Sequence, residues 1–394
     1  MLSIARVMKW TYDVGSIIRQ NRKTIALCER INNYQKTHLY NLSQCRTAQL
    51  GGHIHACNCC RHYTISYNSC RNRHCPSCQS LNREMWVLKQ EKQLLPVSYF
   101  HVVFTIPHEL NGLCLRYPRL LYQLLFKCSW ETIQAFASDN KYLGAKTGMT
   151  AVLHTWGQNL MLHPHLHCII PGGGITPYGK WKTTRSNGKY LFPKTALRKV
   201  FKGKFMAHLK ALAKKEQIIL PNHLRETLYQ KTWVVYAKQP FLGPKQVIEY
   251  LGRYTHKVAI SNYRIKSVTN DKVTFNWKNY TKGGQIKPMS LHTMEFIRRF
   301  SLHFLPKGFT RMRHYGILSS RGRASDIPLL QQELNVLANN YDTDQLKNIA
   351  LSRLKLELKC KRCVTGMMEL RIPFGRAGPG DHTDIQKVIL NHVS

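Results

Sequence analysis

Acidic residues are scarce in this chain of 394 residues. Only 20 residues are Asp or Glu, against 59 Lys and Arg, which gives a formal net charge of +39. Such an excess makes the folded chain repel itself, and a polyanionic partner is the usual reason that this repulsion is tolerated. Hydrophobic residues make up 43% of the sequence, which excludes a disordered basic tail. Ribosomal, membrane-surface and DNA-processing proteins all share such a charge, so the charge indicates a class of partner and no reaction.

Long apolar runs are also missing. No stretch approaches the roughly 20 apolar residues that span a bilayer, and the first residues, MLSIARVMKWTYD, lack the apolar region of a signal peptide. We therefore expect a cytoplasmic protein without a membrane partner, whose thiols stay reduced. Thirteen cysteines in such a chain indicate metal binding before disulfides.

Positive charge is concentrated between residues 180 and 215, where there are twelve Lys or Arg and no acid. Aromatic side chains are interleaved with these charges, namely Tyr178, Trp181, Tyr190, Phe192 and Phe201. Phosphate neutralisation combined with aromatic stacking is typical of single-strand binding. A solvated, mostly helical face is the alternative interpretation.

The residue pattern divides the chain into four expected segments. They are a helical segment at 1–44, a cysteine-rich zinc-binding and DNA-recognition module at 45–95, a catalytic domain at 96–320 and an accessory tail at 321–394. Within the third segment, strands are predicted at 100–106, 150–156, 164–170 and 233–236, with a helical stretch between the first two that ends near residue 137. Irregular alternation of strands and helices favours an α+β fold with an antiparallel sheet.

Two further elements are predicted between residues 243 and 275. Gly243-Pro244 opens a helix that runs to about residue 257, because proline suits the first helical turn. Beyond it, residues 258–260 and 273–275 flank Thr269-Asn270-Asp271, which indicates a hairpin.

Two C-x-x-C pairs predict a structural zinc site. Cys57 and Cys60 form the first pair and Cys75 and Cys78 the second, with fourteen residues between Cys60 and Cys75. Each pair places two thiolates on one tight turn, and two such turns make a tetrahedral four-sulfur site. Cys59, Cys70 and His74 crowd this site and are alternative ligands, with Cys45 a weaker one. Because a closed site leaves no open coordination position, we expect it to serve structure and DNA recognition. The neighbouring basic residues Arg61, His62, Arg71 and Arg73 are expected to contact DNA phosphates.

Three histidines alternate in the run His163-Pro164-His165-Leu166-His167. On a strand, alternate residues share a face, so the three imidazoles would point one way and Pro164, Leu166 and Cys168 the other. Two neutral imidazoles two residues apart can bind one divalent ion. His154, Gln158 or His163 would supply a third ligand, and the sequence leaves that choice open.

Two phenols four residues apart, Tyr250 and Tyr254, would share one face of a helix. Ordinary amphipathic packing explains most pairs with this spacing. Here, however, Arg253 and His256 add groups able to hold a phosphate, and Gly252 permits close approach of a strand. A phenol has an unperturbed pKa near 10, so its attack on a phosphodiester needs help from a divalent ion. The histidine cluster would therefore bind the ion that attack by the tyrosine cluster requires.

Several longer motifs resemble one known family. They are CRTAQLGGH at 45–53, YNSCRNRHCPSCQ at 67–79, LHTWGQNL at 153–160, HPHLH at 163–167 with PGGG at 171–174, and YLGRYTHKVAISN at 250–262. On these motifs the chain resembles the HUH-endonuclease transposases of the insertion sequence ninety-one type, the two-tyrosine rolling-circle family. One departure is Arg61, where glycine is expected after Cys60. Another is Cys360-Lys-Arg-Cys363, a C-x-x-C turn without an obvious partner pair.

The resemblance implies a ferredoxin-like HUH nuclease core with a central antiparallel sheet. His165 and His167 would hold Mg²⁺ or Mn²⁺, a choice that comes from the family because imidazole alone would equally allow zinc. Tyr250 or Tyr254 would attack single-stranded DNA, giving a 5′-phosphotyrosine and a free 3′-hydroxyl that conserve the bond for rejoining. Arg253 and Lys257 would contact the DNA.

Three other functions compete with this interpretation. A catalytically inactive zinc-finger DNA-binding protein would bind DNA without nicking it. A metallohydrolase that uses water would cleave without a covalent adduct, but the chain lacks an H-E-x-x-H motif and an obvious acidic base near the histidines. A plasmid-type replication initiator would share the tyrosine chemistry and differ in the DNA that it serves.

Overall fold

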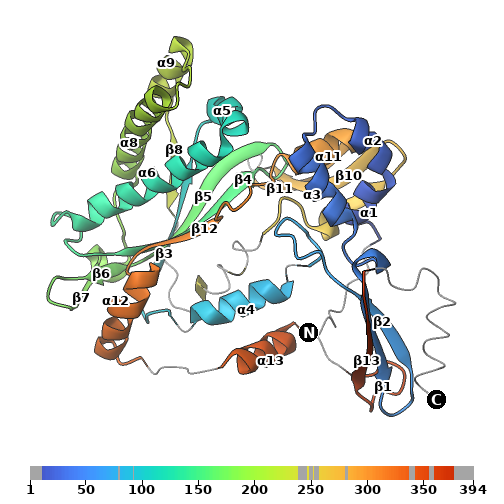
Figure 1. The fold of residues 1–394 in the computed structure, drawn as a ribbon. Helices are drawn as coiled ribbons and strands as arrows, with labels where there is room; N and C mark the ends of the chain where they lie inside the picture. Colours follow the sequence, from blue (N-terminus) through green and yellow to red (C-terminus); the bar gives the residue numbers. More distant parts are fainter. Residues whose placement is uncertain are drawn as a thin grey trace.

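The computed structural model describes residues 11–78, 80–91, 93–237, 246–247, 252, 257–279, 283–336, 342–354 and 359–376. Figure 1 shows a mixed α/β chain in which a central sheet lies between helices, with a small sheet at one end of the molecule. Every helix in these described ranges is too short or too polar to cross a lipid bilayer. The expected helix at 243–257 lies largely outside the described residues, and so do Tyr250, Arg253 and Tyr254.

A five-stranded antiparallel sheet forms the centre, in the order β12-β4-β5-β3-β8. Its strands are β3 (Tyr99–Thr105), β4 (Gly148–Trp156), β5 (Leu162–Pro171), β8 (Val234–Ala237) and β12 (Met312–Gly316). The four strands predicted in this region match β3, β4, β5 and β8, while β12 was not predicted. β4 and β5 form a hairpin, and β5, which carries the histidine run, is the middle strand.

Helices cover one face of this sheet (Figure 1). They are α5 (Asn111–Arg116), α6 (Pro118–Ser138), α8 (Lys194–Lys215) and α9 (Asn222–Gln230), with the 3₁₀ turn η2 (His108–Leu110) leading into α5. The largest core lies here, where Leu121 and Leu125 of α6 and Phe201 of α8 pack against Phe104 and Leu166 of the sheet. Burial of each such side chain contributes about 2 kcal/mol. The predicted helical stretch ending near residue 137 is confirmed by α6.

The basic segment at 180–215 has two distinct faces in the structure. Phe192 and Phe201 are buried in the core, so these two aromatics are not the stacking platforms that the sequence predicted. Tyr178 is 89% exposed and Tyr190 is 48% exposed. The short strands β6 (Gly173–Ile175) and β7 (Trp181–Thr183) pair before α7 (Arg185–Gly188) and α8.

A second antiparallel sheet, in the order β11-β10-β9, carries the amino-terminal helices. Its strands are β9 (Ile265–Val268), β10 (Lys272–Asn279) and β11 (Gln285–His292), followed by α11 (Thr293–Ser301). Apolar residues of α1 (Val14–Gln20), α2 (Arg22–Leu27) and α3 (Asn33–Ser43) share one core with β10 and α11. The capping box of Asn32 and Gln35 starts α3 and stabilises it by roughly 1 kcal/mol.

The predicted hairpin around Thr269-Asn270-Asp271 is half right. The turn lies where it was expected, and residues 273–275 fall within β10. Its partner, however, is β9, with Val268 opposite Val273, while residues 258–260 form no strand. Ala259 and Ile260 are instead buried in an irregular segment, because their apolar side chains fill the core beneath the sheet.

A small three-stranded sheet brings distant parts of the chain together. Its order is β13-β1-β2, with β1 (Gly52–Cys57) following the 3₁₀ turn η1 (Ala48–Leu50), then β2 (Tyr63–Tyr67) and β13 (Met368–Phe374). α13 (Thr343–Arg353) packs on α4 (Ser80–Glu91) through Leu88, Leu346 and Ala350, and α12 (Ser320–Glu333) precedes it. The part of the chain expected to be an accessory tail therefore contacts the cysteine-rich module.

Candidate metal centres and the adjoining basic cavity

The histidine run of β5 alternates as the sequence predicted. Leu162, Pro164 and Leu166 are buried, whereas His163 is exposed and His165 and His167 are partly buried. Leu166 and Cys168 pack into the main core. The histidines consequently line the face of the sheet opposite α6 and α8.

Three imidazoles converge on that face. Ring nitrogens of His154, His165 and His167 all lie within 4.8 Å of one another, because His154 on β4 stands directly opposite His165 on β5. The Nε2 atoms of His165 and His167 are 3.1 Å apart. Two nitrogens each about 2.1 Å from one ion lie roughly 3 Å apart when they subtend a right angle there. The three residues therefore fit a divalent ion without rearrangement of the strands.

Outer hydrogen bonds fix how these rings are turned. Nδ1 of His165 lies 2.6 Å from the carbonyl oxygen of His163, so Nδ1 donates and Nε2 keeps its lone pair. Nδ1 of His167 lies 2.9 Å from Nε2 of His101 on β3, and the two rings stack. Partners of this kind orient metal-binding histidines and set their tautomers. His101 was not predicted as a site residue.

Both central histidines are neutral at physiological pH. Burial, reinforced by the charges of His163 and Lys257, lowers the pKa of His165 to about 3. Burial also lowers the pKa of His167 well below its usual value, with smaller contributions from His154 and other neighbours. A neutral imidazole offers a lone pair, which is the form that binds a metal.

Of the two histidines considered as a third ligand, His154 joins the cluster and His163 does not. His163 is exposed and outside it, and its carbonyl oxygen is what His165 contacts. Gln158 lies in the β4–β5 turn, where its backbone carbonyl accepts from Arg264 at 2.5 Å. His154 stacks on Trp156, with ring centroids 4.6 Å apart.

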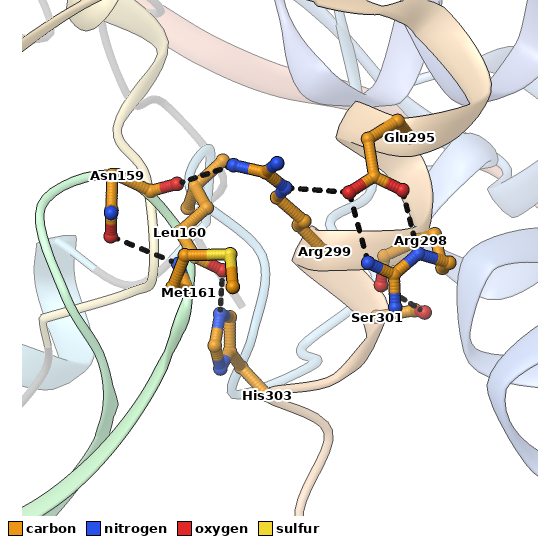
Figure 2. Close-up of polar contacts among 8 residues, drawn as sticks. All are labelled: Asn159, Leu160, Met161, Glu295, Arg298, Arg299, Ser301 and His303. Atoms are coloured by element: carbon orange, nitrogen blue, oxygen red, sulfur yellow. Dashed lines mark hydrogen bonds and ion pairs between the residues drawn. The ribbon is translucent and has the colours of Figure 1, made fainter. Parts of the chain in front are cut away.

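The β4–β5 turn is held by the end of α11 (Figure 2). Nε2 of His303 lies 3.1 Å from the carbonyl oxygen of Leu160, and Arg299 donates to the carbonyl oxygen of Asn159 at 3.4 Å. Glu295 accepts from Arg298 and Arg299, each with a contact of 2.7 Å. This network fixes the tip of the hairpin whose two strands carry His154 and His165.

The cysteines form two clusters, and this corrects the predicted single site. Cys75 and Cys78 join Cys45 and Cys70, whereas Cys57 and Cys60 join Cys360 and Cys363. The prediction failed because it paired the two C-x-x-C turns that are nearest in sequence. The sheet instead brings each turn to cysteines elsewhere, since β13 follows Cys363 and pairs with β1, which ends at Cys57.

Sulfur spacing in both clusters suits a tetrahedral metal. In the first, Cys45 and Cys75 are 3.5 Å apart and Cys70 and Cys78 are 3.8 Å apart, Sγ to Sγ. In the second, Cys57–Cys363 and Cys60–Cys360 are both 3.6 Å. Sulfurs about 2.3 Å from zinc form a tetrahedron with edges of roughly 3.8 Å, and a disulfide would be about 2.05 Å. His74, also considered as a ligand, lies outside both clusters.

The residues predicted to contact DNA lie in different settings. Arg73 donates to the backbone carbonyls of Leu305, Pro306 and Phe309, so it anchors the cysteine-rich module internally and is not on an open DNA-binding face. Arg71 is exposed. Lys257 is partly buried and lines a cavity.

That cavity has a volume of about 590 Å³ and joins three parts of the fold. Cys75 and Arg83 contribute from the cysteine-rich module and α4, Gln158 from the hairpin turn, and Trp277 and Lys278 from β10. Its basic lining residues are Arg83, Lys257, Arg264, Lys266 and Lys278, and no acidic residue is among those of the described chain that line it. Trp277 and Lys278, which also line the cavity, were not predicted as site residues.

Comparisons with known proteins agree with this picture. Residues 17–106 match a family described as transposase zinc-binding domain, of the IS91 type, and residues 148–325 match a family described as putative transposase. The putative transposase y4qJ of Sinorhizobium fredii (strain NBRC 101917 / NGR234) is 44% identical over 306 residues, which cover 74% of this chain and 76% of that protein. No solved structure matches the chain.

A second relative is the transposase for insertion sequence element IS801 of Pseudomonas savastanoi pv. phaseolicola. It is 27% identical over 336 residues, which cover 81% of this chain and 78% of that protein. The cluster of Cys45, Cys70, Cys75 and Cys78 lies wholly within the residues that match the zinc-binding domain. With these motifs, this domain order and these relatives, the chain belongs to the insertion-sequence transposases of the IS91 type.

Proposed function

We propose that this transposase nicks and rejoins single-stranded DNA through a 5′-phosphotyrosine intermediate, as rolling-circle transposition requires. His154, His165 and His167 would hold a divalent ion, and Tyr250 and Tyr254 would be the nucleophiles. The observation that carries the proposal is the convergence of three imidazoles on one face of the central sheet, two of which, His165 and His167, are kept neutral because burial lowers their pKa.

Lys257 links the histidines to the cavity. It lines the cavity, and its charge contributes to the lowered pKa values of His165 and His167. Arg311 donates to its backbone carbonyl at 3.1 Å, and the carbonyl of Arg311 accepts from Leu153 of β4. Gly252, which lies between the two tyrosines in sequence, also lines the cavity. A strand lying in the cavity would therefore reach Lys257, whose charge acts on His165 and His167.

The fold is compatible with a HUH-type nuclease core. The two histidines lie on the middle strand of a five-stranded antiparallel sheet, and helices α6 and α8 close the opposite face. This arrangement supports the ferredoxin-like assignment, which stays part of the proposal. Mg²⁺ or Mn²⁺ is the ion that the family resemblance implies, because imidazole ligands alone would also suit zinc.

The bound ion and the side chains of the protein would have different roles in the reaction. A divalent ion bound at the histidines would polarise the scissile phosphate. A tyrosine hydroxyl loses its proton as its oxygen forms a bond to phosphorus, the bond from phosphorus to the 3′-oxygen breaks, and the released oxygen takes up a proton as a 3′-hydroxyl. Lys257 and Lys278 neutralise phosphates, and Trp277 offers a ring on which a base can stack. A second tyrosine can then accept another strand.

The decisive experiment follows a covalent adduct. The full-length protein is incubated with Mn²⁺ and 3′-labelled single-stranded oligonucleotides that span the ends of the element carrying the gene. Denaturing electrophoresis then separates free DNA from protein-linked DNA. We expect labelled protein with the native chain, and none with Tyr250→Phe combined with Tyr254→Phe or with His165→Ala combined with His167→Ala.

Other outcomes select other functions. An adduct that persists in the double tyrosine variant would overturn the nucleophile assignment. Metal-dependent cleavage without any adduct indicates water as the nucleophile, and salt-sensitive binding without cleavage indicates a DNA-binding protein only. Tyr263→Phe, which changes an exposed phenol of the cavity lining, is the matched control and should leave adduct formation intact.

A further inference from the structure

The turn Cys360-Lys-Arg-Cys363 lies outside both matched families, which end at residues 106 and 325, yet it meets Cys57 and Cys60. We propose that these four cysteines bind a second structural zinc ion, separate from the one held by Cys45, Cys70, Cys75 and Cys78. The ion joins segments that are 306 residues apart in the chain.

The four sulfurs are arranged as two facing turns. Sγ of Cys57 lies 3.6 Å from that of Cys363, and Sγ of Cys60 lies 3.6 Å from that of Cys360. Both distances are close to the edge of a zinc–sulfur tetrahedron, roughly 3.8 Å, and far longer than a disulfide. Four neutral thiols gain little free energy from lying so close together. Four thiolates repel one another, so they need a cation between them.

Backbone N–H groups point at the sulfurs. The amides of Cys59 and Cys60 donate to Sγ of Cys57 at 3.4 and 3.5 Å. On the other turn, the amide of Arg362 donates to Sγ of Cys360 at 3.4 Å, and that of Gly366 donates to Sγ of Cys363 at 3.3 Å. Charge-assisted hydrogen bonds of this kind stabilise a sulfur in its thiolate form, which is the form that binds a metal.

The turns also share an unusual backbone conformation. Arg61 follows Cys60 with φ 54°, and Val364 follows Cys363 with φ 66°. Arg46 and Arg71, which follow Cys45 and Cys70 of the first cluster, have φ 61° and 52°. Four of the eight non-glycine residues with positive φ in the described chain therefore directly follow a cluster cysteine. Such strain, greatest for a β-branched valine, persists only where the surroundings enforce it.

Contacts around the cluster hold the two turns in register. The amide of Asn58 donates to the carbonyl of Met367, and the amide of Met367 donates to the side chain of Asn58 at 2.9 Å. A side-chain carbon added at Gly366 would lie 2.4 Å from Sγ of Cys57, so only glycine permits this approach. β13 then continues along β1 and makes β1 the middle strand of its sheet.

The experiment counts zinc in the full-length protein and maps the thiols that it protects. Elemental analysis of the native chain should give two zinc ions. The variant Cys360→Ser with Cys363→Ser should hold one, and so should Cys57→Ser with Cys60→Ser. All four substitutions together should also leave one ion, because both pairs serve a single site.

A matched control lies within the same turn. Cys59 is exposed and outside the cluster, so Cys59→Ser should keep both ions. Alkylation of the native protein followed by mass spectrometry should modify Cys59 and spare Cys360 and Cys363 until a chelator is added. This measurement needs no substitution, so it decides the matter even if a cysteine variant fails to fold.

Two results would overturn the proposal. One is a native chain that holds a single zinc ion. The other is rapid alkylation of Cys360 and Cys363 in the zinc-loaded protein at the rate of Cys59. The first cluster provides the positive reference, because Cys75→Ser with Cys78→Ser should remove its ion and leave the second site protected.

Discussion

Nε2 of His101 on β3 lies 2.9 Å from Nδ1 of His167 on β5, and the two rings stack with their centroids 5.2 Å apart. If Nδ1 of His167 donates this hydrogen bond, its Nε2 keeps a lone pair that faces Nε2 of His165. His101 is thus a positioning residue, which acts on the metal site through His167.

Replacement of His101 should weaken metal binding without removing a ligand. We expect His101→Ala to lower Mn²⁺ affinity about 10- to 100-fold, the usual effect of losing an outer-shell partner. His101→Gln, whose side-chain oxygen can accept the same hydrogen bond, should lose less. Calorimetric titration with Mn²⁺ measures both, with His208→Gln on the far helix α8 as control. Equal affinities for the native and alanine proteins would contradict the positioning role.

The third ligand can be identified by comparing two neighbours on the hairpin. His154→Ala should abolish measurable Mn²⁺ binding and nicking, because its imidazole joins the cluster. Gln158→Ala should bind Mn²⁺ nearly as tightly as the native chain, since the contact of Gln158 with Arg264 uses the backbone carbonyl. The opposite ranking of the two variants would make Gln158 the ligand.

The basic cavity should contribute to the affinity for single-stranded DNA in two ways, through base stacking and through phosphate neutralisation, and these can be measured separately. Trp277→Ala should weaken binding by about 1–3 kcal/mol, the range for loss of one stacked base, with an unchanged dependence on salt. Lys278→Ala should instead reduce the slope of log affinity against log salt by about 0.7. Fluorescence anisotropy at several salt concentrations separates the two effects. Tyr229→Ala, an exposed aromatic on α9, is the control, and parallel behaviour of all three variants would exclude the cavity as the DNA path.

The ion pairs of Glu295, in the network that holds the β4–β5 turn, should make the stability of the folded chain sensitive to acid. Hydrogen bonds from Arg298, with further help from Arg299, lower the pKa of Glu295 to about 2 from its usual value of 4.5. A lowered pKa in the folded state adds stability that is complete above pH 4.5 and is lost as the pH falls through about 2. Because these groups are partly exposed, the contribution is about 1 kcal/mol or less.

Thermal unfolding of the native chain and of Glu295→Gln tests this difference. We expect the native chain to have the higher melting temperature at pH 7. The difference in melting temperature between the two proteins should narrow progressively at pH 4 and pH 3. A difference in melting temperature that is constant over this pH range would show that the Glu295 side chain contributes through its shape and not through its charge.

Strain at Val364 should be relieved by glycine. Val364 has φ 66°, a conformation that costs an ordinary residue roughly 1–2 kcal/mol and glycine almost nothing. Val364→Gly should therefore retain zinc at a higher chelator concentration than the native chain. Val364→Ala keeps the side-chain carbon that causes the strain and serves as the matched variant. If alanine raised the chelator resistance of the zinc site as much as glycine does, the explanation would be contradicted.

Local pattern in the sequence was enough to identify four of the five strands of the central sheet and the direction of the side chains in the histidine run. Alternation along 163–167 follows from the two-residue repeat of a strand, so the positions of His165 and His167 on one face needed no tertiary information. The same reasoning found β3, β4, β5, β8 and α6, and the motifs identified the family. It failed at 258–260, because a short apolar run does not distinguish a strand from an irregular buried segment.

Tertiary structure decided which of these groups meet. His154 and His101 reach the metal site because β4 and β3 flank β5 in a particular register, and register depends on packing across the whole sheet. The division of the cysteines into two clusters is the clearest case. A zinc ion imposes geometry on four sulfurs and no order along the chain, so C-x-x-C spacing indicates ligands without naming their partners. Only the pairing of β13 with β1 brings Cys360 and Cys363 to Cys57 and Cys60.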